Sequence, residues 1–353
     1  MHRILLLLLL LLIATALALL SACGSRTYLE TGTGAPDAAA SGGQPTPKKC
    51  VPGAAPAVLV SKAGEFVIDG SGQLFVDHVV GGLHGASRVS TTDGSVGAPL
   101  FLDTDGHSTL ALDSTHLYWS YIDAKGGFGL RRVARDGGRA ETLTTLPDFA
   151  RGLAVDEHDL YFGLIAPASP RGLMRIPKTG GPPVVIVDAH QGFDVLAMSA
   201  TRIYANDPGW LWSFDKITLA SKRNLLFAPN AAVVDGETVF ASGGADDVSG
   251  QPPTGKVFIL PDGLTPAVAL ADRQASPTQL AFDDAFVYWV NIGTLTHDDA
   301  GTRPDNNGAI VKVPKSGGSP QTVVQTGGAG SPIAVDDECV YWWADGAIMK
   351  VHK

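Results

Sequence analysis

The sequence lacks the short linear motifs by which many enzymes are recognised. Its 353 residues contain no G-x-S-x-G elbow, no H-E-x-x-H, no P-loop and no C-x-x-C. Basic residues are also fewer than acidic ones: the chain has 26 Lys and Arg and 35 Asp and Glu, which gives a net charge of -9. A basic surface for nucleic acid is therefore not indicated. An enzyme whose site is assembled from distant segments would leave no such motif, so that class stays open.

Cysteine is almost absent, and the first of the three cysteines closes an N-terminal signal. His2 and Arg3 precede an apolar run from Ile4 to Leu20, and Leu20-Ser21-Ala22-Cys23 follows directly. This end resembles a bacterial lipoprotein signal, which implies cleavage before Cys23 and acylation of its sulfur and its new amino group. A transmembrane anchor is the alternative, because an apolar run of this length lies near the lower limit for a span.

The segment after Cys23 favours a lipid-anchored protein of the outer membrane. Gly24 stands where an inner-membrane retention signal would place Asp. Residues 24–56 are rich in Gly, Ala, Ser, Thr and Pro, a composition that predicts a flexible tether. We therefore divide the chain into a signal peptide (1–22), a lipid-anchored linker (23–56) and a folded region (57–353). The membrane is one expected partner, through the anchor.

Helical periodicity is missing beyond the signal, and the chain instead repeats one phrase at intervals of roughly 44 residues. Each copy places an Asp, or its replacement, between a short apolar run and an aromatic run, as in LAVDEHDLYF and IAVDDECVYW. A second phrase such as GLMRIPKTGG and a third apolar run such as PVVIV follow most copies. Four short β runs per repeat predict the blade of a β-propeller. The repeated position is occupied by Asp69, Asp113, Asp156, Ser199, Asp235, Asp283 and Asp336.

Seven repeats predict an all-β, seven-bladed propeller, with six or eight blades as the alternatives. The first strand of each repeat is apolar on both sides and is expected to line the central channel. The Asp is expected to accept hydrogen bonds from backbone N–H groups two residues later, in a tight turn. The Tyr-Trp pair on the second strand is expected to pack between adjacent blades. We interpret these repeated residues as structural.

The last repeat is incomplete, because Lys353 is reached before a fourth strand. The stretch PAVLVSKAG, from Pro56, resembles PQTVVQTGGAG, from Pro320, which is a fourth strand. We therefore expect the N-terminal residues to complete the last blade and close the ring. Cys50 and Cys339 would then lie near the same end of that blade, which predicts a disulfide. Two unpaired thiols are the alternative.

The aromatic phrases LYWS, VYWV and VYWW follow the repeated Asp and precede a glycine-containing turn. They resemble the YWTD-type propellers, and still more the secreted bacterial propellers described as lipoproteins. The resemblance implies the fold and no particular ligand. YWTD propellers have six blades, whereas seven repeats are counted here. The Thr-Asp that completes their motif is replaced by Ser120-Tyr121 and by Val290-Asn291.

The loops between second and third strands vary in length and are expected to share the functional face with the crossovers between blades. The longest, NIGTLTHDDAGTRPDNNG, is rich in oxygen and nitrogen donors but lacks the acid spacing of a calcium loop. The stretch DTDGHS, from Asp103, begins like a calcium loop and then enters a strand, so we expect an exposed turn. No cofactor is predicted, and a divalent cation is the alternative. Candidate binding residues on this face are Tyr121, Trp210, Trp212, Trp289, Asn291, His297, Asp298, Asp299, Asp305 and Trp343.

Aromatic side chains beside Asn and Asp at the strand ends suit a partner peptide or a sugar. We therefore expect a non-enzymatic binding or scaffold module of the cell envelope, which contacts an envelope protein or a glycan through the loop face. The alternative is a propeller lyase or hydrolase with its site at the channel mouth. An enzyme requires a His and two carboxylates that converge on the loop face. A binding module requires an exposed apolar patch on that face or on the side of a blade.

Overall fold

The computed structural model describes residues 50–69, 71–165, 171–189, 192–207, 209–224, 229–244, 251–261, 266–298, 301–327, 330 and 332–353. The signal peptide, Cys23 and the linker up to residue 49 lie outside these residues. Within them the secondary structure is entirely β. The same residues contain no apolar helix long enough to cross a membrane.

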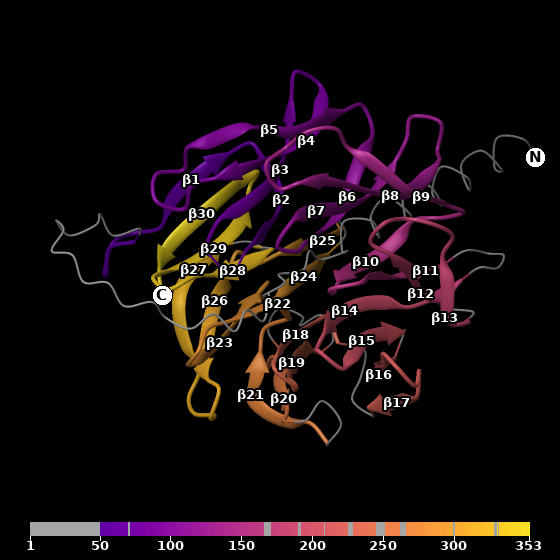
Figure 1. Ribbon diagram of the computed structural model, residues 1–353. Helices are drawn as coiled ribbons and strands as arrows, with labels where there is room; N and C mark the ends of the chain where they lie inside the picture. Colours follow the sequence, from indigo (N-terminus) through magenta and orange to yellow (C-terminus); the bar gives the residue numbers. More distant parts are fainter. Residues whose placement is uncertain are drawn as a thin grey trace, which may run out of the picture.

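Seven antiparallel sheets of four strands each form the body of the protein, and they are arranged as a seven-bladed β-propeller (Figure 1). Each blade runs from an inner strand to an outer edge strand, in the order a, b, c and d. Blade 1 is β2 (Ala63–Ile68), β3 (Leu74–Val80), β4 (Leu83–Val89) and β5 (Val96–Asp103). Blade 2 is β6 (Gly106–Leu112), β7 (His116–Ile122), β8 (Phe128–Ala134) and β9 (Glu141–Leu146). Blade 3 is β10 (Ala150–Val155), β11 (Asp159–Leu164), β12 (Gly172–Pro177) and β13 (Val184–Val187).

The remaining blades follow the same order, and only blades 6 and 7 depart from consecutive numbering. Blade 4 is β14 (Asp194–Met198), β15 (Arg202–Asp207), β16 (Trp210–Asp215) and β17 (Ser221–Asn224). Blade 5 is β18 (Ala231–Asp235), β19 (Thr238–Gly243), β20 (Gly255–Leu260) and β21 (Val268–Gln274). Blade 6 is β22 (Pro277–Phe282), β23 (Phe286–Asn291), β26 (Gly308–Pro314) and β27 (Gln321–Gly327). Blade 7 is β28 (Ile333–Val335), β29 (Cys339–Ala344), β30 (Ala347–His352) and β1 (Ala57–Ser61).

The inner strands form a closed ring around the channel, as the sequence predicts. Each inner strand contacts the inner strand of the next blade, and β28 of blade 7 contacts β2 of blade 1. Inner strands are buried on both sides, which explains why they read as short uninterrupted apolar runs. The prediction of a seven-bladed propeller is confirmed.

The repeated Asp organises the a–b turn in the predicted way in blades 1, 2, 3, 6 and 7, and it also joins neighbouring blades. In blade 2, Asp113 Oδ1 accepts hydrogen bonds from the backbone N–H groups of Thr115 (2.7 Å) and His116 (2.7 Å). Its second oxygen accepts a hydrogen bond from the Tyr118 hydroxyl (2.9 Å) and pairs with Lys178 of blade 3. In five blades the repeated Asp forms an ion pair with a cation of the next blade. The pairs are Asp69 with Arg135, Asp113 with Lys178, Asp156 with Lys216, Asp235 with Lys315 and Asp283 with Lys353.

Blade 4 replaces this arrangement, because its repeat has Ser199 in place of Asp. The Ser199 hydroxyl accepts the backbone N–H groups of Thr201 (3.2 Å) and Arg202 (3.0 Å), so the turn is kept. The same hydroxyl donates to Glu237 Oε2 of blade 5 (2.9 Å). The acid is therefore supplied by the next blade, and the junction remains polar.

A Tyr-Trp pair stands on the b strands of blades 2, 6 and 7, and its two side chains point to opposite faces of the strand and fill the two adjoining blade junctions. Tyr118 is buried among blade 3 side chains, whereas Trp119 is buried among blade 1 side chains and stacks on Phe101 with ring centroids 4.0 Å apart. Successive residues of a strand point to opposite faces, so one dipeptide serves two junctions. The predicted interblade packing of these pairs is confirmed.

Blade 7 is completed by the N-terminal strand, and this strand lies beside β30 in Figure 1. The antiparallel register pairs Ala57 with Lys350, Val58 with Met349 and Val60 with Ile348. A disulfide joins Cys50 to Cys339 with a Cα–Cα distance of 5.7 Å. The Trp343 indole N–H donates to the Ala63 carbonyl at 2.7 Å, which holds blade 7 against the first strand of blade 1. Both predictions, the closing strand and the disulfide, are confirmed.

Candidate functional site

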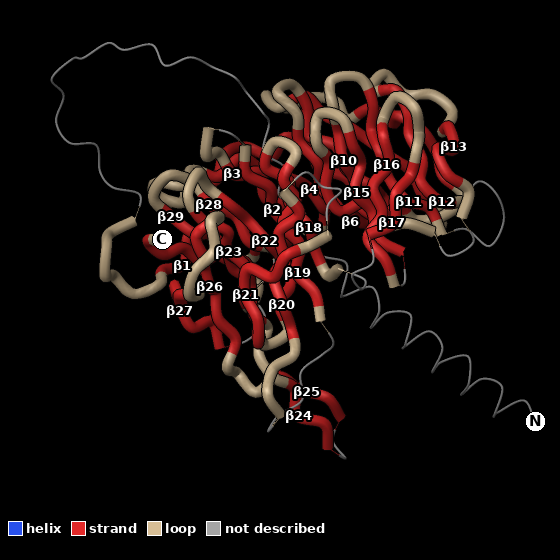
Figure 2. Tube along the Cα trace, turned by 90° about the horizontal axis from the view of Figure 1, so that it is seen from below, coloured by secondary structure: helices blue, strands red, loops and turns tan. Residues whose placement is uncertain are grey.

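The loop face carries the b–c turns and the d–a crossovers, and in blade 6 it carries a hairpin. The predicted polar loop after Asn291 folds into β24 (Leu295–Asp298) and β25 (Gly301–Pro304). This hairpin projects from the body of the propeller (Figure 2). Asp305 braces its base, because its two carboxylate oxygens accept the hydroxyls of Thr294 (2.5 Å) and Thr296 (2.5 Å). Asp305 is thus a structural residue of the hairpin.

Three predicted binding residues near the hairpin tip cannot be placed as side chains. His297 and Asp298 belong to β24, but their side chains lie outside the described part of the structure, as does the whole of Asp299. Their role therefore stays a prediction.

Two of the predicted aromatic residues meet at the loop end of blade 4. Trp210 and Trp212 are half-buried on β16, and the Arg223 guanidinium lies 4.1 Å from the Trp210 ring centroid. The Trp212 indole N–H donates to Asp207 at 2.9 Å. One face of Trp210 is therefore covered by a cation, as in a cation–π pair.

The other aromatic candidates serve packing. Trp289 is buried, and its indole N–H donates to Gln274 (3.2 Å) and Asn291 (3.0 Å), while the Asn291 amide donates to Gln274 (3.0 Å). Tyr121 is also buried, with the Arg131 guanidinium 4.0 Å from its ring centroid. Trp343 is half-buried at the ring closure described above. These three aromatic side chains therefore contact other parts of the propeller, as expected for residues that pack between blades.

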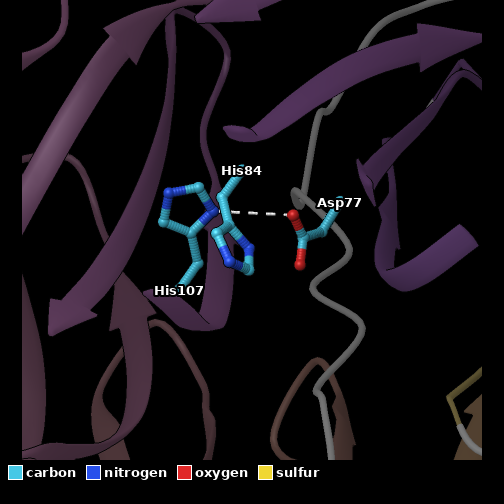
Figure 3. Close-up of side chains that lie close together, drawn as sticks. All are labelled: Asp77, His84 and His107. Carbon is cyan, nitrogen blue, oxygen red and sulfur yellow. Dashed lines mark ion pairs between the residues drawn. The ribbon is translucent and has the colours of Figure 1, made fainter. Parts of the chain in front are cut away.

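A close group of three titratable side chains lies between blades 1 and 2, on elements that end at the loop face (Figure 3). Asp77 comes from the b strand β3, His84 from the start of the c strand β4, and His107 from the start of the inner strand β6. One ligand atom of each of these three residues lies within 4.8 Å of the others. Gly85 lets β4 approach β5 closely, because a Cβ at this position would come within 2.5 Å of the Phe101 carbonyl oxygen.

His107 stands between two carboxylates from blade 1. Its Nε2 lies 3.0 Å from Asp103 Oδ1, and its Nδ1 lies 3.5 Å from Asp77 Oδ1. The second oxygen of Asp103 is held by Arg131 at 2.9 Å, and Arg131 also pairs with Asp105 at 2.7 Å. The His107 side chain is only 2% exposed. One imidazole and two carboxylates therefore converge at the junction of the first two blades.

The electrostatics of this group favour a charged imidazole when the carboxylates have no other partner. Burial alone would lower the pKa of His107, but the hydrogen bond to Asp103 and the negative charges of the nearby Asp77 and Asp103 carboxylates outweigh it and raise that pKa to about 9. Burial opposes ionisation of Asp103, yet the hydrogen bond and charge of His107, the Asp105 backbone N–H and Arg131 hold the pKa of Asp103 below its ordinary value. The group is thus a coupled set of charges in a largely buried place.

Two polar atoms of this group have no hydrogen-bond partner among the described residues. They are Asp77 Oδ1 and His107 Nδ1, and they face each other. Buried polar atoms without a partner are rare in folded proteins and call for an explanation. Their separation of 3.5 Å is too long for a good hydrogen bond.

This group could not be predicted from the sequence, because its members are far apart along the chain. The expectation that DTDGHS forms an exposed turn is wrong, since Asp105 is buried and the His107 side chain is almost fully buried. The stretch connects the outer strand of blade 1 to the inner strand of blade 2, so it runs through a blade junction. The spacing Asp103-x-Asp105-x-His107 was a signal in the sequence. Asp77 and His84, however, lie on β3 and β4, about 20–30 residues earlier in the chain, and no pattern links them to this stretch.

An apolar groove runs along the other side of blade 1, at the junction with blade 7. It has a volume of about 300 Å³ and is lined by residues of β1, β3, β4 and β5, Val60, Val76, Val80, Val89, Val96 and Pro99 among them. Val79, Val80 and Val96 at the groove are exposed, at 57%, 45% and 52%, respectively. The groove is thus the exposed apolar patch on the side of a blade that a binding module requires.

Comparisons with known proteins support the fold and no activity. No protein-family model matches the chain, and no curated protein sequence matches it. Among solved structures, the computationally designed Ika8 protein is similar over 84% of this chain and 96% of its own, with 14% identity and a TM-score of 0.55. An oligogalacturonate lyase in complex with manganese is similar over 65% of this chain and 74% of its own, with 14% identity and a TM-score of 0.50. A nidogen/laminin complex matches over 66% of this chain and 83% of its own, with 15% identity and a TM-score of 0.45.

Proposed function

We propose that the protein is a lipid-anchored binding propeller of the cell envelope, which docks an apolar segment of another envelope protein in the groove between blades 7 and 1. The observation that carries this proposal is the groove itself, with its exposed valines. Contiguous exposed apolar surface is uncommon on soluble proteins and often marks an interaction site. The anchor at Cys23 follows from the Leu-Ser-Ala-Cys sequence and would hold the groove near partners in the same membrane.

A protein partner is favoured over a glycan by the chemistry of the two candidate surfaces. Sugars bind on free aromatic faces with hydrogen-bond donors and acceptors around them. The Arg223 guanidinium already covers one face of Trp210, and Trp289 is buried in a blade junction. The groove offers valine and proline side chains instead, which suit Leu, Ile, Val or Phe side chains of a polypeptide.

Site-specific photo-crosslinking in envelopes tests the proposal. A photoreactive residue at Val96, in the groove, is expected to crosslink one membrane protein, whereas the same residue at Ile217, which is 92% exposed on a c–d turn, is not. Val80→Asp places a charge in the groove and is expected to reduce the Val96 crosslink about tenfold or more, because the burial of one valine contributes about 1.5 kcal/mol and tenfold corresponds to about 1.4 kcal/mol. Cys23→Ala is expected to move the protein from the membrane to the soluble fraction.

Three results would contradict the proposal. Equal crosslinking from Ile217 would show that the groove is not selective. An unchanged Val96 crosslink in the Val80→Asp protein would remove the groove from binding, and a Cys23→Ala protein that stays with the membrane would remove the lipid anchor.

A propeller lyase or hydrolase is the second candidate, and one observation favours it. His107 lies between Asp103 and Asp77 near the loop face, which is the convergence that an enzyme requires. The ring is almost fully buried, however, so it could not contact a large substrate without movement of its surroundings. The variant His107→Gln separates the two functions in the crosslinking assay. The binding proposal predicts an unchanged Val96 crosslink. Loss of the crosslink in a folded variant would show that the partner binds at the His107 group instead of the groove.

A further inference from the structure

We propose that Asp77, His84 and His107 form a binding site for one zinc ion at the junction of blades 1 and 2. The three side chains approach one another from three different strands, with their ligand atoms within 4.8 Å (Figure 3). Two imidazoles and one carboxylate are a ligand set that suits zinc, whereas calcium and magnesium prefer oxygen ligands alone. This inference is independent of the apolar groove, which lies on the opposite side of blade 1.

The unpartnered atoms fit the positions of metal ligands. Zinc binds imidazole nitrogen at about 2.0–2.1 Å and carboxylate oxygen at about 2.0–2.2 Å, so two tetrahedral ligands stand about 3.4 Å apart. Asp77 Oδ1 and His107 Nδ1 are 3.5 Å apart, and neither has a hydrogen-bond partner among the described residues. An ion between them would satisfy both atoms. The partly exposed His84 ring lies edge-on to the His107 ring at 5.4 Å and reaches the ion by a side-chain rotation.

The surroundings supply the outer contacts that a zinc-bound histidine needs. With Nδ1 on the metal, the other ring nitrogen of His107 donates to Asp103 at 3.0 Å, and Arg131 and the Asp105 backbone N–H hold that carboxylate. A carboxylate behind the histidine fixes the ring and increases its basicity as a ligand. The group contains three carboxylates and one guanidinium, so its charge is -2 with both imidazoles neutral. That charge favours a dication.

Three protein ligands leave one tetrahedral position for water. Sites of this kind are typical of zinc that takes part in chemistry or binds a further ligand, whereas structural zinc sites fill all four positions with protein groups. His84 and Asp77 are partly exposed, so the open position lies toward the loop face.

The test uses the full chain, purified without a polyhistidine tag and stripped with a chelator. Titration with zinc chloride by isothermal calorimetry is expected to give one ion per chain, and cobalt(II) is expected to give the visible absorption of a tetrahedral site. His84→Ala is the sharpest variant, because His84 lies at the edge of the group and its loss should leave the fold intact. Asp103→Asn removes a partner of a ligand and should lower the zinc affinity by about 10–100-fold. His84→Ala removes a ligand itself and should lower the zinc affinity by more. His158→Ala, with a side chain that is 81% exposed in blade 3, is the matched control and should bind like the wild type.

Two outcomes overturn the proposal. One is a folded, stripped protein that takes up no zinc or cobalt. The other is uptake that His84→Ala and Asp77→Asn leave unchanged, since the ion would then lie elsewhere. A zinc-induced rise in the melting temperature of the wild type that is absent from His84→Ala supports the site by a measurement that does not depend on catalysis.

Discussion

Replacement of Cys50 and Cys339 by serine is expected to lower the free energy of unfolding by about 5 kcal/mol, at the upper end of the usual range of about 2–5 kcal/mol. The bridge links residues 289 positions apart, so it restricts nearly the whole unfolded propeller. In the chain-entropy relation, the stabilisation by a disulfide grows with the logarithm of the number of residues in the loop that it closes. A loop of this length therefore gives a stabilisation near the upper end of the usual range. Cys50 precedes the strand that completes blade 7 by a few residues, so the bridge also tethers that end of the strand to β29.

Denaturant unfolding with and without reductant measures this effect. The reduced wild type and the double serine variant should unfold at the same, lower denaturant concentration. The reductant should leave the variant unchanged, which controls for effects on other groups. Equal midpoints for the oxidised wild type and the variant would mean that the ring is held without the bridge.

Removal of the Asp113 carboxylate is expected to cost about 3–5 kcal/mol, because Asp113→Ala leaves buried groups without their partner. The carboxylate is 9% exposed and holds the a–b turn of blade 2, the Tyr118 hydroxyl and Lys178 of blade 3. Its loss therefore opens a turn and a blade junction together. Asp136→Ala is the matched control, because Asp136 pairs with Arg88 on the surface at 93% exposure, and its loss should change the unfolding midpoint little.

The same carboxylate gives a pH dependence of known sign. Burial opposes ionisation of Asp113, but hydrogen bonds from Lys178, the Thr115 and His116 backbone N–H groups and the Thr115 hydroxyl outweigh it and lower its pKa from 3.8 to about 2. A lowered pKa means that the contribution to stability is fully present above about pH 4 and is lost as the pH falls through 2. Asp113→Asn should therefore show a shallower loss of stability than the wild type between pH 4 and pH 2. Parallel curves would show that Asp113 titrates alike in the folded and unfolded chain.

Most of the fold could be predicted from the sequence, because the propeller is built from local signals that recur. The Asp of each turn, the alternating Tyr-Trp pair and the Gly-rich c–d turn each act within one blade or across one junction. The closing strand could be predicted as well, since the residues after Pro56 resemble the fourth strands of other repeats. The interblade cations escaped prediction, although Arg135, Lys178, Lys216, Lys315 and Lys353 all stand at or just after the end of a c strand.

The candidate sites were less predictable, because they depend on which blades become neighbours. Asp77, His84 and His107 carry no common motif, and only the packing of blade 1 against blade 2 brings them together. The groove requires β1 to lie beside blade 1, which follows from the ring closure and from no local pattern. The long loop of blade 6 was predicted only as a polar loop. Its base is held by Asp305 and Asn307, whose contacts with Thr294 could not be seen in the sequence.

The groove and the closure of the ring both depend on the N-terminal strand that completes blade 7, and one measurement tests the place of this strand most directly. In the Cys50→Ser, Cys339→Ser background, Val58→Cys and Met349→Cys place two thiols on residues that face each other in the β1–β30 register. Mild oxidation followed by peptide mapping should recover the two peptides joined by a disulfide, and Val58→Cys with Thr322→Cys on β27 of blade 6 should not join. Free thiols in the first pair, in a folded protein, would show that residues 57–61 lie away from blade 7 and that the ring is closed in some other way.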